Sequence, residues 1–277
     1  MTTEYGKKSR ICLGWPWYDG PDKNTYQRYM EVCHYFGKMQ ERSEWLAWAK
    51  HNEIDRKDVP MLDTMQCDGA LAEITADDGQ FEFGYTDETG LSLVGEARER
   101  CIDNALQGGY DWIFFWDDDM LFAWSAFLRL WRHQKPAVAA LAFTAREPIL
   151  PVIFKWQISP RNGGEKWHAT NILDYPKNKL ISNEDVGGVI AFGTGVCLFN
   201  LSIFREIPKP WFNSTGMGED VHFCLKCHQH GFPIYVDTSV KTLHKRYHPA
   251  WHGEKEYEES RKNHPEIYAK ILSGELR

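Results

Sequence analysis

The sequence predicts an α/β fold with a mostly parallel, doubly wound central sheet, and three observations support this class. The run Trp112–Trp116 consists of five large apolar residues, which suits a strand buried on both faces. Short apolar segments of this kind alternate with helical patterns along the chain. Three aspartates, Asp117 to Asp119, follow the apolar run directly, at the carboxyl edge where open α/β sheets bind ligands.

The beginning of the chain contains the first units of this sheet. Residues 11–15 predict a short strand. A helix is expected to begin at residue 24 or 25 and to end at Gly37, and a further helix covers residues 44–51. Strand followed by helix is the repeating unit of a doubly wound sheet.

The middle of the chain continues the alternation. Residues 60–66 predict a second strand, and the acidic residues 77–90, which contain glycine, predict a surface excursion. Apolar spacing over residues 93–105 predicts the helix that leads into the aspartate strand. A helix over residues 122–133 and a buried strand over residues 137–143 follow.

The segment after this buried strand is less regular. Residues 147–185 contain four prolines and predict irregular structure with short hairpins, where a substrate-specific wall could lie. Residues 189–199 are apolar but are interrupted by Gly193, Thr194 and Gly195. Such glycines indicate either a β-bulge or a backbone that comes close to another group.

Composition sets the broad class of the protein. A fraction of 43% hydrophobic residues with 12 tryptophans in 277 residues is enough for a sizeable core. The net charge of −7 argues against a general polyanion binder. No apolar run approaches the roughly 18 residues of a membrane span, and the polar first ten residues resemble no signal peptide. We therefore expect a cytoplasmic protein.

The seven cysteines are predicted to be reduced core residues, because their number is odd and they lie in apolar segments. Cys224, Cys227 and His228 match the haem-attachment pattern C-x-x-C-H. That attachment requires export, for which the chain shows no signal, and a zinc site would need a second ligand pair. We interpret this segment as a helix whose cysteines pack in the core.

Two acidic segments are the candidates for chemistry. Asp117 and Asp119 are two positions apart and can converge on one hard cation, although a solvated acidic turn is the simpler interpretation. Glu219 and Asp220 precede a helical pattern, where the helix dipole stabilises ionised carboxylates. Such a pair is either an ordinary cap or a rigidly held base. His244, further along the chain, is either structural or a ligand.

The order of these segments resembles that of the GT-A-fold glycosyltransferases, in particular the family-two-like enzymes of bacteria and phages. Those enzymes combine a hydrophobic strand ending in D-x-D, a glycine-rich strand, a G-E-D segment that opens a helix, and a metal-binding histidine. The corresponding elements here are Trp112 to Asp119, Phe192 to Gly195, Gly218-Glu219-Asp220 and His244. The resemblance covers residues 10–244 and implies a GT-A, Rossmann-like nucleotide-diphospho-sugar transferase fold.

The resemblance implies a metal site for the diphosphate of a nucleotide-sugar donor. Asp119 and His244 would bind the cation, and Asp117 would contact the ribose or share the metal. Because an imidazole ligand is unusual for Mg²⁺, Mn²⁺ is the expected cofactor.

The resemblance also implies the donor and acceptor sites. Trp15 and Tyr18 would line the base pocket, and Asp118 and the segment Gly193, Thr194 and Gly195 would lie against the donor. Arg98 would reach donor phosphate or sugar, unless it is an ordinary surface arginine. Asp220 would be the base of an inverting reaction, and Glu219 would bind a sugar hydroxyl. In retaining relatives the carboxylate at the position of Asp220 binds substrate instead.

Two other functions remain possible on this reading. A nucleotidyltransferase also brings carboxylate-bound metal to a diphosphate, but it normally has an arginine-bearing, glycine-rich loop after the first strand, which the segment from Gly14 to Trp17 is not. A non-catalytic nucleotide-sugar-binding module is the third reading. The donor is expected to be a UDP- or GDP-sugar, and the acceptor a glycan, a protein or a modified DNA base.

The chain is divided into a transferase domain, residues 1–245, and a lid and tail packed on it, residues 246–277. Residues 245–253 combine cationic, aromatic and glycine residues, which suits a lid that closes over a diphosphate. In this reading Trp251 excludes water and Gly253 is a hinge. An ordinary solvated tail is the alternative.

Overall fold

The computed structural model describes residues 8–16, 23–51, 53, 71, 73–88, 93–123, 125–161, 164–213, 218–245 and 251–274. The first part contains β1 (Lys8–Pro16), α1 (Lys23–His51), the 3₁₀ turn η2 (Ala76–Asp78), β2 (Gln80–Glu88), α4 (Val94–Gln107), β3 (Trp112–Trp116), β4 (Met120–Phe122), α5 (Ala126–Arg132) and β5 (Ala137–Leu141). The second contains β6 (Ile153–Arg161), β7 (Gly164–Asn171), β8 (Leu180–Ile181), α6 (Asn183–Val186), β9 (Val189–Phe192), β10 (Val196–Asn200), α7 (Ser202–Glu206), α8 (Glu219–Gln229), β11 (Ile234–Lys245), β12 (Trp251–His252), α9 (Glu254–Asn263) and α10 (Pro265–Ser273).

The central sheet has the strand order β2-β1-β3-β10-β5-β11, and β4, β8 and β12 also pair with β11. β1 is parallel to β2 and β3, and β5 is parallel to β11. β10 is antiparallel to both of its neighbours, β3 and β5. The strands β2, β1, β3, β5 and β11 therefore all run in one direction, which confirms the predicted α/β class with a mostly parallel sheet. Their carboxyl ends reach the same edge of the sheet.

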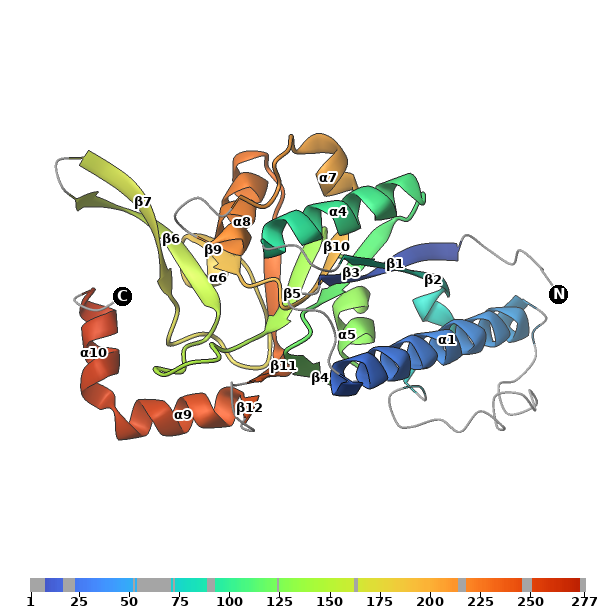
Figure 1. Ribbon diagram of the computed structural model, residues 1–277, viewed down its shortest axis with the longest axis horizontal. Helices are drawn as coiled ribbons and strands as arrows, with labels where there is room; N and C mark the ends of the chain where they lie inside the picture. The colour runs from blue at the N-terminus through green and yellow to red at the C-terminus, as the bar shows by residue number, and fades with distance from the viewer. Residues whose placement is uncertain are drawn as a thin grey trace.

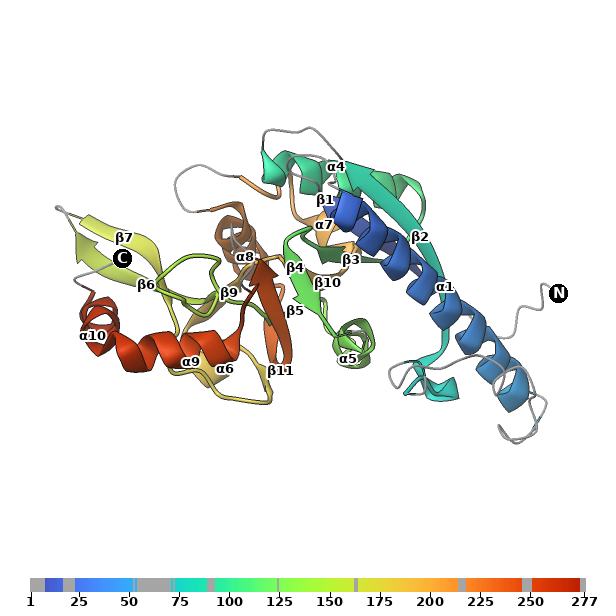
Figure 2. The ribbon, with the colours of Figure 1, turned by 60° about the horizontal axis from the view of Figure 1, so that its bottom comes forward.

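Both faces of this sheet are covered, as the apolar run of β3 predicts. Ile113 and Phe115 pack on the face that carries α4, α7 and α8. Trp112, Phe114 and Trp116 pack on the opposite face, against α1 and α5. The two layers of helices are visible on either side of the sheet in Figure 1, and Figure 2 shows α1 lying diagonally across β1 and β2. The alternation of Cβ directions along a strand explains why one apolar run serves two cores.

A smaller sheet of order β7-β6-β9 lies beside the central one. β6 and β7 form the hairpin that extends from the body at the upper left of Figure 1. The expectation of hairpins within residues 147–185 is thus correct. The glycine-containing segment of residues 193–195 connects β9 in this sheet to β10 in the central sheet, so it is a crossing between sheets rather than a bulge.

Three expected elements differ from the structure. The described part of the expected excursion over residues 77–90, residues 77–88, contains β2, where Phe81 and Phe83 pack against Phe127, so it is not an excursion. α1 continues through Gly37, since the stripe of buried residues around it outweighs the roughly 1 kcal/mol cost of a helical glycine. The helix expected over residues 122–133 begins at Ala126, because Met120–Phe122 pairs with β11. The expected strand over residues 60–66 lies outside the described residues.

The end of the chain packs on the body. Tyr257 of α9 and Tyr268 of α10 are each 2% exposed and belong to the hydrophobic core, so the described part of this segment is not a solvated tail. Lys245 and Trp251 are paired strand residues, and Gly253 packs closely against Leu243. Residues 246–250, the middle of the expected lid, lie outside the described residues.

Two further expectations concern the cysteines and the membrane. Cys12, Cys101, Cys197, Cys224 and Cys227 are buried free thiols, so the prediction of reduced core cysteines is confirmed for these residues. Among the described helices, none is both long enough and apolar enough to span a bilayer.

Candidate active site

The candidate site lies where β3, β11 and the first turn of α8 meet. The Asp117 amide donates to the Gly195 carbonyl at 2.8 Å, which joins the end of β3 to the segment between β9 and β10. The Lys245 amide donates to the Asp119 carbonyl at 2.8 Å, and Met120 pairs with His244 across β4 and β11. Backbone pairing thus brings the aspartate turn and the end of β11 together.

Arg98 of α4 joins three of the predicted carboxylates. Its Nη2 donates to both oxygens of Asp117 at 2.8 Å, and its Nη1 donates to Glu219 Oε1 at 2.9 Å. The same Nη1 lies 3.4 Å from Asp220 Oδ1. The Arg98 side chain is 1% exposed, so the alternative of a surface arginine is wrong. A buried guanidinium whose two terminal nitrogens donate to carboxylates is a rigid centre for the site.

Close packing between α4 and α8 makes this geometry possible. A Cβ at Gly95, one turn before Arg98, would lie 3.2 Å from the Phe212 carbonyl oxygen and 3.4 Å from Glu219 Cβ. Gly95 was not among the residues predicted from the sequence, although a small residue one helical turn from a candidate arginine is a signal for close helix packing.

Asp220 is oriented by the glycine-containing segment. The Thr194 hydroxyl donates a hydrogen bond to Asp220 Oδ1, and Thr194 is fully buried. Asp220 Oδ2 has no hydrogen-bond partner among the described residues. A Cβ at Gly193 would lie 2.6 Å from Val152 Cγ1, so this position accepts no larger residue without movement. The structure therefore fixes one oxygen of Asp220 and leaves the other available.

His244 faces Asp119 across the sheet edge. His244 Nδ1 lies 2.7 Å from the Phe143 carbonyl oxygen, and Nε2 lies 2.9 Å from Asp119 Oδ2. Burial disfavours the charged imidazole, but the Asp119 carboxylate and the Phe143 carbonyl outweigh it and raise the pKa of His244 above its usual value. Because both ring nitrogens face acceptors, the pair requires a cation between Nε2 and Asp119, which is either a proton or a metal ion.

Asp119 and His244 have the donor chemistry of a metal site. The Phe143 carbonyl fixes the His244 tautomer that presents Nε2 as a ligand, which is the usual outer contact of a metal-binding histidine. Both oxygens of Asp117 accept hydrogen bonds from Arg98, and the Asp117 carboxylate interacts with Asp119 and His244 through its charge. Within the described part of the chain, no three His, Cys, Asp or Glu side chains converge as a complete metal cluster. A cation here would have two protein ligands, with the rest of its shell left to water and phosphate.

Negative charge exceeds positive charge at this edge of the sheet. Four carboxylates lie near one guanidinium and one imidazole: Asp117, Asp119, Glu219 and Asp220 near Arg98 and His244. Burial raises the pKa of Asp117 to about 7, and Asp119 and Asp220 add to this rise while Arg98 opposes it. Burial alone would lower the pKa of Arg98, but its carboxylate partners raise it, so the guanidinium stays charged. The excess negative charge favours a bound cation.

The remaining predicted residues are Trp15, Asp118 and Tyr18. Trp15 is 1% exposed and packs against Trp116 with ring centroids 4.9 Å apart, so it is a core residue in this structure. Asp118 is half-buried in the turn after β3. Tyr18 lies outside the described residues.

The chain has distant structural similarity to several solved proteins. It matches the crystal structure of A197 from STIV with a TM-score of 0.40 and 14% identity, over 85% of each chain. A provisionally named nucleotide-diphospho-sugar transferase from Desulfovibrio desulfuricans G20 matches with a TM-score of 0.31 and 12% identity, over 83% of this chain and 80% of that chain. UDP-glucose pyrophosphorylase complexed with UDP-glucose matches with a TM-score of 0.33 and 11% identity, over 93% and 99%. No family profile and no curated protein matches the chain. The functional proposal therefore depends on the side chains of the site.

Proposed function

We propose that the protein is a metal-dependent glycosyltransferase of the GT-A type, which moves a sugar from a nucleotide-sugar donor to an acceptor hydroxyl. One observation supports it. The Asp119–His244 pair and the carboxylates bound by Arg98 lie at the same carboxyl edge of the sheet. A mostly parallel sheet with ligand-binding groups at that edge suits a nucleotide.

A divalent cation bound by Asp119 and His244 would neutralise the charge that develops on the diphosphate leaving group. Mn²⁺ suits this mixed oxygen and nitrogen ligand pair better than Mg²⁺ does. The side chains of the protein perform the other steps. Arg98 fixes the side chains of Asp117 and Glu219. In this proposal Asp117 contacts the ribose of the donor, and Glu219 accepts a hydrogen bond from a sugar hydroxyl.

Asp220 is the base in this proposal. Its Oδ1 is fixed by Thr194, and its Oδ2 accepts the proton of the attacking acceptor hydroxyl. Direct attack by that hydroxyl inverts the anomeric centre. Because Arg98 Nη1 also lies 3.4 Å from Asp220 Oδ1, the carboxylate is held at a fixed position relative to Asp117 and the donor.

The metal assignment predicts a loss of ligand-dependent stability. In wild type, Mn²⁺ with UDP or GDP should raise the melting temperature, because a ligand that binds the native state stabilises it. Asp119→Ala and His244→Ala should each abolish this increase and leave the melting temperature without ligand close to that of wild type. The Asp119 side chain is 45% exposed, so its removal should not disrupt the core.

The control is Asp77→Ala, which removes a carboxylate that is 87% exposed and lies on η2, outside the site. If both Asp119→Ala and His244→Ala respond to the nucleotide and Mn²⁺ as wild type does, the metal assignment is incorrect. The products of turnover then distinguish the reactions, since a glycosyltransferase releases nucleoside diphosphate and a nucleotidyltransferase releases pyrophosphate.

A further inference from the structure

A hollow lies away from the carboxylate cluster, between α9 and the segment that leads into β8. Its volume is about 540 Å³, which is in the range of small-molecule sites. Its walls come from residues 173–177, from Asp185 and from α9, and none of the lining residues belongs to the candidate active site. The proposed chemistry at the sheet edge therefore leaves this hollow without a role.

Aromatic rings form the buried part of this hollow. Tyr175 and Tyr257 are 6% and 2% exposed, and their ring centroids are 6.4 Å apart. The Tyr175 hydroxyl donates to Glu254 Oε1 at 2.9 Å, and the Tyr257 hydroxyl donates to the Leu173 carbonyl at 2.7 Å. These hydrogen bonds fix both rings before any ligand arrives. The rings form the floor of the hollow, and because they are almost fully buried, recognition of a ligand depends on the polar rim.

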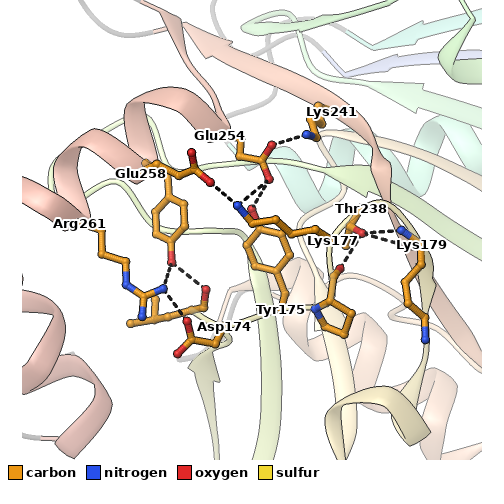
Figure 3. Close-up of polar contacts among 12 residues, drawn as sticks. Asp174, Tyr175, Lys177, Lys179, Thr238, Lys241, Glu254, Glu258 and Arg261 are labelled. Atoms are coloured by element: carbon orange, nitrogen blue, oxygen red, sulfur yellow. Dashed lines mark hydrogen bonds and ion pairs between the residues drawn. The ribbon is translucent and has the colours of Figure 1, made fainter.

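The rim of the hollow is polar but carries no net charge. Three acidic residues alternate with three basic ones: Asp174, Asp185 and Glu258 with Lys177, Arg261 and Lys262. Figure 3 shows Arg261 facing Asp174, and Lys177 lying between Glu254 and Glu258. Polyanions such as nucleic acids require an excess of cations, which is absent from this lining.

Several polar groups of the rim have atoms that are available for hydrogen bonds to a ligand. Asp174 Oδ2, Glu258 Oε2 and the Lys262 ammonium have no hydrogen-bond partner among the described residues. Asp174 and Glu258 each use one oxygen in an ion pair, with Arg261 and Lys177 respectively. The hollow therefore offers both acceptors and donors, which matches hydroxyl groups, because each hydroxyl donates and accepts.

Glu254 links the hollow to β11, the strand that carries His244. Lys241 of β11, three residues before His244, forms an ion pair with Glu254, as Figure 3 shows. His252, two residues before Glu254, pairs with His244 across β11 and β12. Glu258 and Arg261 follow Gly253 by five and eight residues, or roughly 8 and 12 Å along α9 at 1.5 Å per residue. An extended oligosaccharide spans such a distance.

We propose that this hollow binds a neutral oligosaccharide and serves as a distal subsite for a glycan acceptor. The acceptor role rests on the proposed glycosyltransferase function. Sugar units whose hydroxyls bind Asp174 and Glu258 lie along α9, and the first residue of this helix, Glu254, contacts Lys241 of β11. Binding energy from such remote units is used to position the reacting hydroxyl.

The test is direct binding of named probes to the full chain, measured by saturation-transfer NMR and calorimetry. The probes are cellotetraose, maltotetraose, mannotetraose and chitotetraose, with tetragalacturonic acid as the anionic comparison. At least one neutral tetrasaccharide should bind at millimolar concentration. Glu258→Ala and Asp174→Ala should each weaken it about tenfold, as expected for a lost charge-assisted hydrogen bond. Both carboxylates are more than half exposed, at 55% and 70%, so neither variant should affect folding.

Glu259→Ala is the matched control, because Glu259 is the next residue of α9 and does not line the hollow. Its affinity for the neutral probe should equal that of wild type. The proposal is overturned if no neutral probe binds, if Glu258→Ala binds as tightly as Glu259→Ala, or if the anionic probe binds more tightly.

Stabilisation of wild type by UDP or GDP with Mn²⁺ is measured in parallel. Stabilisation without glycan binding rejects the subsite alone, whereas glycan binding without stabilisation rejects the transferase and leaves a sugar-binding site.

Discussion

Replacing Arg98 with methionine is expected to lower the free energy of unfolding by about 3 kcal/mol, the scale of a broken buried ion pair. Methionine fills much of the same volume but leaves Asp117, Glu219 and Asp220 without their common cation. These carboxylates are 22–26% exposed, so water compensates in part, and the estimate is at the low end of the range for buried pairs. Urea unfolding of the variant and wild type measures the difference.

Arg100→Met is the matched control, because Arg100 lies on the same helix and is exposed. Its effect should stay within about 0.5 kcal/mol, as for most surface substitutions. Adding Asp117→Asn to Arg98→Met should recover part of the stability, since one uncompensated carboxylate is then removed. Equal stability of Arg98→Met and Arg100→Met would show that Arg98 does not hold the site together.

Replacing Asp220 with asparagine is expected to reduce turnover about 100-fold or more, the scale of a lost general base. Asparagine keeps the shape of aspartate and accepts the Thr194 hydrogen bond through Oδ1, but it cannot take a proton from the acceptor hydroxyl. Stabilisation by nucleoside diphosphate with Mn²⁺ should remain close to that of wild type. The release of nucleoside diphosphate from the donor measures turnover.

Asp77→Asn is the control for this substitution, because the Asp77 carboxylate is 87% exposed and lies on η2, outside the site. Its turnover should equal that of wild type. If Asp220→Asn also turns over at the wild-type rate, Asp220 is not the base, and a retaining reaction or a purely structural role would explain its contacts with Thr194 and Arg98.

Elements with strong local patterns could be predicted from the sequence. The apolar run of β3, the helical spacing of α4 and the apolar segment of β5 all appear in the structure near their expected bounds. Each of these patterns reflects burial of an element on one or two faces, and that burial is visible over a few neighbouring residues. β2 was not predicted, because its acidic residues and glycine resemble a loop when its partner β1, about seventy residues earlier, is not considered.

The positions of the candidate residues could be predicted only in part. The sequence pattern singled out Asp119, His244, Glu219 and Asp220, and the structure brings their side chains to one region of the sheet edge. The contacts made by these groups could not be predicted. Thr194 was expected to lie against the donor, whereas its hydroxyl binds Asp220, and Arg98 was expected to reach the donor or solvent, whereas it is buried among carboxylates. Hydrogen-bond partners depend on side-chain directions at the meeting point of several elements, which spacing along one element does not contain.

By itself, the sequence determined the α/β class, the aspartate strand and the acidic start of α8, because apolar spacing and helix-start residues act over a few positions. Only the tertiary structure decided that Arg98 is buried between Asp117 and Glu219, which lie 19 and 121 residues from it. It also decided that His244 Nε2 faces Asp119, 125 residues away. The physical reason is that desolvation and ion pairing depend on which distant elements the folded sheet brings together, and the cost of burying a charge is set by those partners.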